Sequence, residues 1–350
     1  MLISKQYTSI GGQAVIEGVM MRSPNAFVVA VRKPDGKIVL RRDQWFGLSK
    51  KFDFLKKPFI RGVLVLIETM ANGIVSLNYS ANKAAEEEDQ KKASEKIDLG
   101  TFLSIAFSFL LGIGLFVFLP HALTALIEKQ AGQEWGLNSM AFHAVDGVIK
   151  AFIFISYIFL IGLIPDIRRV FQFHGAEHKS ISTFEAGEEL TIENAKKYTT
   201  FHPRCGTTFI FFLLFISILL FTFLFNFIPL PTEWNPIVRH LAALILKVFL
   251  SFPIAGVSYE LIKKVGQISD STLGRIISTP GMWLQRLTTR DPEDDQLEVA
   301  LASIKAVLHL EEKYNLKEAN QKVMTLEEVE VEGLQDLEDS NFKLNDFLEV

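Results

Sequence analysis

Residues 174–178 of this 350-residue chain read His-Gly-Ala-Glu-His, a set of residue types and a spacing suited to transition-metal chemistry. On a helix, residues four apart share a face, so His174 and His178 would point their imidazoles the same way. Glu185 falls on that face too if the helix continues. Glu177 would lie to one side as a general base, as in the H-x-x-E-H metallopeptidases. The pattern predicts a divalent-metal site, with zinc as the first choice.

A second group of possible ligands, His202 and Cys205, directly precedes an apolar stretch that begins at residue 206. An imidazole or thiolate from this turn could complete a shell of three or four ligands. Two other interpretations stay open for Cys205. It could be an inert small residue at a helix start, or a nucleophile with His202 as its base, although no third orienting group is evident. Gly175 weakens the case for an unbroken helix through the first group.

Two basic residues lie beside these ligands, Lys179 and Arg204. They could hold an anionic substrate or stabilise negative charge that develops during a reaction. A simpler explanation is that they mark the cytoplasmic side of the membrane, as Lys and Arg generally do near span ends.

Four apolar stretches, 99–127, 140–165, 206–228 and 237–259, are each long enough to cross a bilayer. The loops 128–139 and 229–236 contain one basic residue between them, Lys129, whereas the 166–205 loop and the region after 259 are rich in Lys and Arg. We therefore expect the 166–205 loop and both termini to be cytoplasmic, in a multi-pass protein of the inner membrane. The single cysteine, Cys205, excludes an intrachain disulfide.

The expected fold is an α-helical membrane protein with about four transmembrane helices, a small N-terminal β-hairpin-containing cytoplasmic region and a C-terminal amphipathic helix. The hairpin is predicted around Pro34-Asp35-Gly36, within residues 1–57. Residues 58–98 are expected to form an interfacial helix and a charged connector, and 166–205 a His-rich loop. Residues 260–317 are expected to be helical, broken at Pro280-Gly281, with the amphipathic helix starting at Pro292. Residues 318–350 read as a disordered acidic tail.

Ionisable residues inside two predicted spans are the other unusual feature: Asp146 and Lys150 with His143 in one, and Lys247 with His240 in the other. Buried charges are costly in a bilayer and are usually paired or functional. Asp146 could pair with a lysine and lock the two spans together. Alternatively, the lysines could serve the transport of a small anion.

Four segments resemble the signature segments of the YqhQ family: 11–22 (GGQAVIEGVMMR), 171–179 (FQFHGAEHK), 202–206 (HPRCG) and 280–289 (PGMWLQRLTT). The resemblance covers roughly residues 8–310. It implies a multi-span bacterial inner-membrane protein of unknown function, in a family commonly described as predicted metal-dependent enzymes. It does not supply a reaction.

The favoured hypothesis is a metal-dependent membrane hydrolase that acts at the cytoplasmic face on a membrane peptide or a lipid headgroup. His174, His178 and His202 would be ligands, with Cys205 or Glu185 completing the shell, and Glu177 would be the base. The alternative is a non-enzymatic assembly or regulatory factor in which the same cluster is structural; a transporter is the weaker third reading. We expect the lipid bilayer as a partner, a homo-oligomer as an option, and no nucleic acid, because the basic residues of the first 60 lack a binding motif.

Overall fold

The N-terminal region forms a five-stranded antiparallel sheet, larger than the hairpin expected there. In the computed structural model, which describes residues 10–23, 27–43, 53–85, 99–132, 135–228, 230–231, 233–268, 271–316 and 327–339, the strand order follows the chain from β1 to β5. The strands are β1 (Gly11–Val15), β2 (Gly18–Arg22), β3 (Phe27–Arg32), β4 (Ile38–Asp43) and β5 (Glu327–Val331). The expected hairpin is confirmed as β3 and β4, whose turn contains Gly36 at φ 90°.

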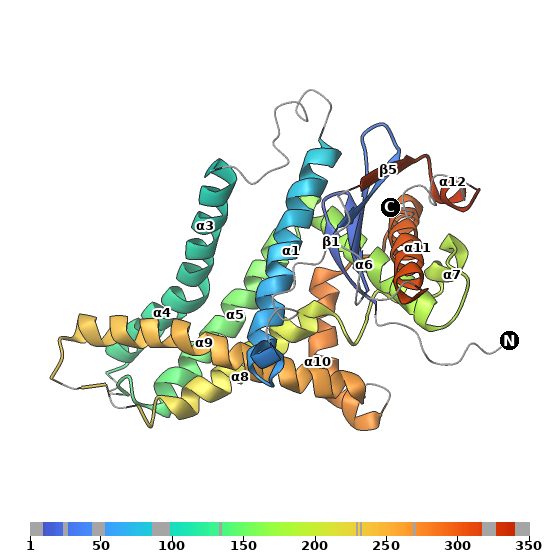
Figure 1. Cartoon of the computed structure of the whole chain (residues 1–350). Helices are drawn as coiled ribbons and strands as arrows, with labels where there is room; N and C mark the ends of the chain where they lie inside the picture. The colour runs from blue at the N-terminus through green and yellow to red at the C-terminus, as the bar shows by residue number, and fades with distance from the viewer. Residues whose placement is uncertain are drawn as a thin grey trace.

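Both faces of this sheet are covered by helices. Residues along each strand point alternately to opposite sides, so each strand supplies side chains to both faces. One face packs against α6 (Pro165–Glu185) and α11 (Asp294–Leu316), and the other against α1 (Ile60–Ala84) (Figure 1). Val19 and Met21 belong to the core on the α6 and α11 side, whereas Val15 and Met20 join Tyr79 of α1 on the other. The sheet therefore forms a buried layer between helices.

The acidic tail was expected to be disordered, and this is wrong for part of it. Residues 327–331 form β5, which pairs antiparallel with β4 and places Glu328 opposite Arg41. A short helix, α12 (Leu334–Asp339), follows. Residues 317–326 and 340–350 lie outside the described part of the chain, as do 86–98 of the expected charged connector.

Most of the other helices form a bundle beside the sheet, and the helix of residues 99–113 stands apart from it (Figure 1). Five helical segments are long and apolar enough to cross a membrane: 60–84, 102–130, 140–161, 206–224 and 236–265. The elements are α3 (Leu99–Ile113), η3 (Gly114–Phe118), α4 (Leu119–Gln130), α5 (Met140–Ile161), α8 (Gly206–Leu224) and α9 (Pro236–Gln267), preceded by the short η2 (Asp53–Lys56). Four of these segments match the expected spans, and α1 is the fifth candidate.

Two further expectations need correction. The 166–205 segment is mostly not a loop, because α6 occupies its first half and α7 (Ile192–Lys196) lies in its second. Pro280-Gly281 does not break the chain either, since α10 (Thr272–Thr288) runs through it. A Cβ at Gly281 would lie 2.5 Å from the side chain of Thr208, so α8 and α10 pack closely at this point. The stabilisation from this packing can offset the loss of the backbone hydrogen bond that a proline removes from a helix.

Candidate metal centre

The two histidines of α6 share a face and are held in the same way. His174 Nδ1 lies 2.8 Å from the carbonyl oxygen of Thr288, and His178 Nδ1 lies 2.5 Å from that of Thr200. A carbonyl can only accept a hydrogen bond, so each Nδ1 carries the proton and donates it. This leaves the Nε2 lone pair of each ring available, the arrangement typical of metal-ligating histidines.

Cys205 completes a group of three ligand atoms. It caps the N-terminus of α8, and its Sγ lies 3.2 Å from His174 Nε2. One ligand atom from each of His174, His178 and Cys205 lies within 4.8 Å of the others. His178 Nε2 is buried and, among the described residues, has the Cys205 sulfur nearby but no hydrogen bond of normal geometry. A buried polar atom without a partner is unfavourable, and a bound metal would provide one. This group could therefore bind a metal ion.

The local environment also favours the ligand form of His178. Burial lowers the pKa of this imidazole because it disfavours the charged ring, and the neighbouring Cys205 offsets only part of that effect. Metal binding requires the neutral imidazole.

Gly175, which weakened the sequence case for a helix, has a packing role. A Cβ at this position would lie 2.0 Å from the carbonyl oxygen of Arg290, just after α10. The backbone N–H of Arg290 in turn donates to the carbonyl of Phe171, at 2.9 Å. Only glycine lets α6 approach the end of α10 this closely, and that approach brings the Thr288 carbonyl to His174.

His202 and Glu185 were predicted as ligands, but they lie outside the group of three and pair with each other. His202 Nε2 lies 3.3 Å from a carboxylate oxygen of Glu185, which also forms an ion pair with Arg204. The rings of His202 and His178 are 5.7 Å apart, so the pair is adjacent to the candidate metal centre. Burial would raise the pKa of Glu185, but His202 and Arg204 outweigh it and lower the pKa.

Glu177 and Lys179 lie outside the group of three. Glu177 is buried against β1, where a Cβ on Gly12 would lie 2.9 Å from its side chain, and burial raises the pKa of its carboxyl group. Lys179 Nζ lies 3.3 Å from a carboxylate oxygen of Asp291. Gly12 thus allows β1 to approach α6 closely.

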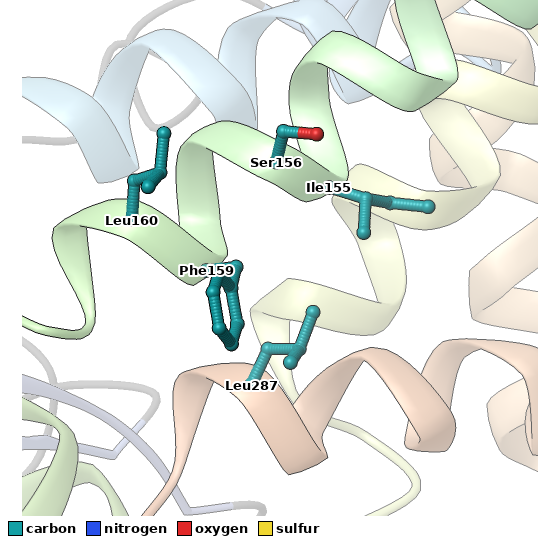
Figure 2. Close-up of a pocket in the computed structure, with 5 residues that line it drawn as sticks. All are labelled: Ile155, Ser156, Phe159, Leu160 and Leu287. Atoms are coloured by element: carbon teal, nitrogen blue, oxygen red, sulfur yellow. The ribbon is translucent and has the colours of Figure 1, made fainter.

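An apolar groove of about 370 Å³ lies between α5 and α10. Figure 2 shows Phe159 of α5 facing Leu287 of α10 across it. The other lining residues are Ile155, Ser156 and Leu160. Leu287 directly precedes Thr288, whose carbonyl holds His174. One lining residue of the groove is thus the sequence neighbour of the residue that holds His174.

The intramembrane charges also come together. Lys247 Nζ lies 3.0 Å from a carboxylate oxygen of Asp146, and Lys150 Nζ lies 3.8 Å from the other oxygen. This confirms that Asp146 pairs with a lysine across two helices. His121, which the sequence pattern did not single out, also joins this cluster. Its signal was available, because it is a polar residue that follows Pro120 inside an apolar stretch.

Gln285 was missed as well. Its side chain holds the backbone of His202 with two hydrogen bonds, of 2.9 and 2.8 Å. The only sequence signal was its place in the 280–289 segment.

Five candidate spans, a sheet covered on both faces and a possible metal-binding group together define a multi-pass membrane protein with a polar centre next to its helix bundle. Residues 57–310 match the family model described as "Protein of unknown function (DUF1385)", and the chain belongs to this family. It is 33% identical over 329 residues to the Bacillus subtilis (strain 168) protein described as "Uncharacterized protein YqhQ", covering 89% of this chain and 95% of that protein. No solved structure matches the present chain.

Proposed function

We propose that this protein is a metal-dependent membrane enzyme, with zinc as its ion and hydrolysis as its reaction. The observation that carries the proposal is the pair of Nδ1 hydrogen bonds to backbone carbonyls, which frees both Nε2 atoms beside the Cys205 sulfur. His174, His178 and Cys205 would be the ligands. Imidazole nitrogen and thiolate sulfur are the donors that zinc prefers.

The number of donors favours catalysis over a purely structural role. Structural zinc sites are usually closed by four protein ligands, whereas catalytic sites have three and keep one position open. The described residues supply three here. When bound, such an ion would act as a Lewis acid on a substrate oxygen.

Other residues of the chain would handle protons and charge. Glu177 is our candidate general base, since burial raises its pKa toward the range in which a carboxylate can exchange protons near neutrality. Arg204 is half-exposed beside Glu185 and could bind an anionic substrate by exchanging that partner. Lys179 would do so only after leaving Asp291. His202 and Glu185, proposed at first as ligands, would orient Arg204 beside the centre.

The apolar groove supports a lipid headgroup, rather than a peptide, as the substrate. Its α5 wall belongs to a candidate span, so it is available to an acyl chain within the bilayer. A lipid seated there would bring its polar end toward Thr288 and the candidate centre.

The sheet supports an assignment of four crossings. Strands β4 and β5 are neighbours in one sheet, so both ends of the chain lie on one side and the helices between cross an even number of times. The second half of α1 contacts this sheet, where Ser80 accepts a hydrogen bond from the Ile16 N–H. We therefore assign α1 to the membrane surface and the crossings to the other four candidates. The excess of Lys and Arg on this side supports a cytoplasmic position for the sheet, in a protein of the bacterial inner membrane.

The second candidate is a non-enzymatic assembly or regulatory factor. It is favoured by the way the cluster joins separate segments: His174 contacts the end of α10, and His178 contacts the segment before α8. In that case the histidines, with or without a metal, would clamp the sheet domain to the bundle. The described residues do not favour transport of a small anion in the same way, because Asp146 already pairs with both lysines.

Metal analysis of the purified full-length protein tests the proposal. We expect about one equivalent of zinc per chain, and its loss in a His174→Ala, His178→Ala double variant. A His309→Ala variant is the matched control, because this histidine lies on α11 and is not a member of the group of three. Wild-type protein that binds no metal after incubation with zinc would overturn the proposal.

A Glu177→Gln variant then separates enzyme from clamp. As an enzyme, the variant keeps its zinc but loses about a hundredfold or more of its activity, and does not complement a deletion strain. As a clamp, it keeps both zinc and complementation.

A further inference from the structure

A continuous chain of titratable side chains runs through the helix bundle, apart from the candidate metal centre. His240 Nδ1 lies 2.9 Å from His121 Nε2, and His121 Nδ1 lies 3.2 Å from Lys247 Nζ. Lys247 Nζ lies 3.0 Å from Asp146. Three helices, α4, α5 and α9, supply these four groups. Each group is therefore within hydrogen-bonding distance of the next.

The direction of each hydrogen bond follows from the donors available. A lysine ammonium can only donate, so His121 Nδ1 accepts from Lys247. His121 then carries its proton on Nε2 and donates to His240 Nδ1. Its two ring nitrogens thus connect the buried ammonium group with a histidine near the start of α9. A neutral imidazole between a donor and an acceptor can pass a proton by changing its tautomer.

The inner end of this chain is deeply buried and the outer end is not. Lys247 and Asp146 are each 1% exposed and His121 is 2% exposed, whereas His240 is only partly buried. His240 is four residues after Pro236, where α9 begins, and Lys247 lies about 16 Å along the helix from that start at 1.5 Å per residue. The four titratable groups therefore run from near the start of α9 to the middle of the bundle.

The charges at the inner end do not balance. Two lysines, Lys247 and Lys150, share one carboxylate, Asp146, and Lys150 otherwise lies over the ring of Phe221. With all three ionised, the cluster carries one excess positive charge in a low-dielectric interior, which is unfavourable. It becomes neutral when one proton leaves. The other titratable or charged groups near the chain are His143, Glu128 and Arg239.

We propose that His240, His121 and Lys247 form a proton relay between the solution at the start of α9 and the buried Asp146 ion pair. Its ligand is a single proton, and this function goes beyond the proposed hydrolase. On release, the Lys247 ammonium gives a proton to His121 Nδ1 while His121 gives its Nε2 proton to His240 Nδ1. His240 then gives its Nε2 proton to water, so each N–H bond that breaks is matched by one that forms.

The helix geometry before His121 supports this proposal independently. Residues 114–118 form one turn of π-helix, η3, directly before Pro120 and His121. Single π turns within helices are rare and occur frequently at functional sites.

A pH jump on the full-length protein in lipid nanodiscs tests the relay, with a fluorescent pH indicator to count protons. On acidification, wild type should take up about one proton per chain more than Lys247→Met, in which Asp146 and Lys150 balance. The His121→Phe and His240→Phe variants should take up this proton at least about tenfold more slowly. His309→Phe, on α11, is the control and should match wild type.

Two results would overturn the proposal: wild-type rates in both His121→Phe and His240→Phe, or equal proton uptake by wild type and Lys247→Met. If Lys247→Met does not fold, ¹⁵N NMR of histidine-labelled wild type decides. A relay moves the His121 proton from Nδ1 to Nε2 as the pH falls, whereas a static bond leaves the spectrum unchanged. Metal content is measured alongside, and loss of zinc binding does not alter the expected proton uptake.

Discussion

The α6 cluster and the bundle cluster both bury histidines, but they use the ring nitrogens differently. In the first, backbone carbonyls accept from Nδ1 of His174 and His178, and among the described residues His178 Nε2 makes no hydrogen bond of normal geometry. In the second, His121 bonds other side chains through both nitrogens. A free lone pair suits a metal ion, whereas a ring bonded on both sides suits a proton. What the second nitrogen contacts therefore separates the two kinds of site.

The largest expected effect comes from removing the charge at the centre of the bundle. Asp146→Asn leaves Lys247 and Lys150 without a counter-ion, and we expect the free energy of unfolding to fall by about 3–5 kcal/mol. Asp291→Asn is the matched control, because Asp291 pairs with Lys179 while 88% exposed. Denaturation of both variants in detergent measures the difference, and equal losses would contradict the contrast between a buried and an exposed pair.

Zinc should stabilise the protein through the α6 cluster and not through the bundle cluster. At about a hundredfold excess over its dissociation constant, zinc should add about 2.7 kcal/mol to the free energy of unfolding. We expect this gain in Asp146→Asn as in wild type, but a much smaller one in Cys205→Ser. Thermal denaturation with and without zinc measures it. A full gain in Cys205→Ser would remove the sulfur from the ligand set.

Gly175→Ala tests the approach of α6 to α10. The added Cβ would lie 2.0 Å from the Arg290 carbonyl oxygen, so we expect a loss of about 1–3 kcal/mol in unfolding free energy and weaker zinc binding. Gly112→Ala is the control, since a Cβ there meets nothing within 4 Å. Zinc titration of the two variants measures the effect on the site. Unchanged zinc affinity in Gly175→Ala would show that the Thr288 carbonyl does not need this approach.

The smallest effect is expected for an ion pair at the surface of the sheet. Lys33 Nζ lies 2.9 Å from Glu330 of β5, and Lys33→Met should cost about 1 kcal/mol or less. The hydrogen bond to Glu330 raises the pKa of Lys33 above its ordinary 10.5, so the contribution is complete below that pH and is lost as the pH rises through the raised pKa. Denaturation of wild type and variant at pH 8 and pH 12 measures this contribution. A larger loss of unfolding free energy in the variant at pH 12 than at pH 8 would contradict the predicted direction.

Sequence spacing predicted the face that His174 and His178 share, because that geometry is local to one helix. It did not predict that Cys205, and not His202, is the third member of the group. The His202 ring contacts Glu185 instead, and its backbone is held by Gln285 from a helix more than 80 residues later in the chain. Likewise, spacing placed Lys247 and His240 on one face, but only packing brought His121 of α4 between them.

The β5 strand shows why composition alone predicted disorder for a part of the tail that is ordered. Residues 327–331, Glu-Glu-Val-Glu-Val, look like part of an acidic tail when read alone. Their register sets Glu327 and Glu328 opposite Arg42 and Arg41 of β4, and opposite charges across two strands stabilise the pair. The complementary basic pair lies almost 300 residues earlier, beyond the reach of any local pattern.

The position of β5 also has a consequence for biosynthesis. Translation delivers β1–β4 first, but the strand that covers β4 emerges only after every helix of the bundle has been made. During that interval β4 is an open edge, and open edges invite pairing with other chains. Its two arginines, Arg41 and Arg42, place positive charge on that edge, and charged side chains are a common protection against such pairing. Arg41 and Arg42 therefore protect the edge of the nascent sheet against pairing, and later lie opposite its last strand.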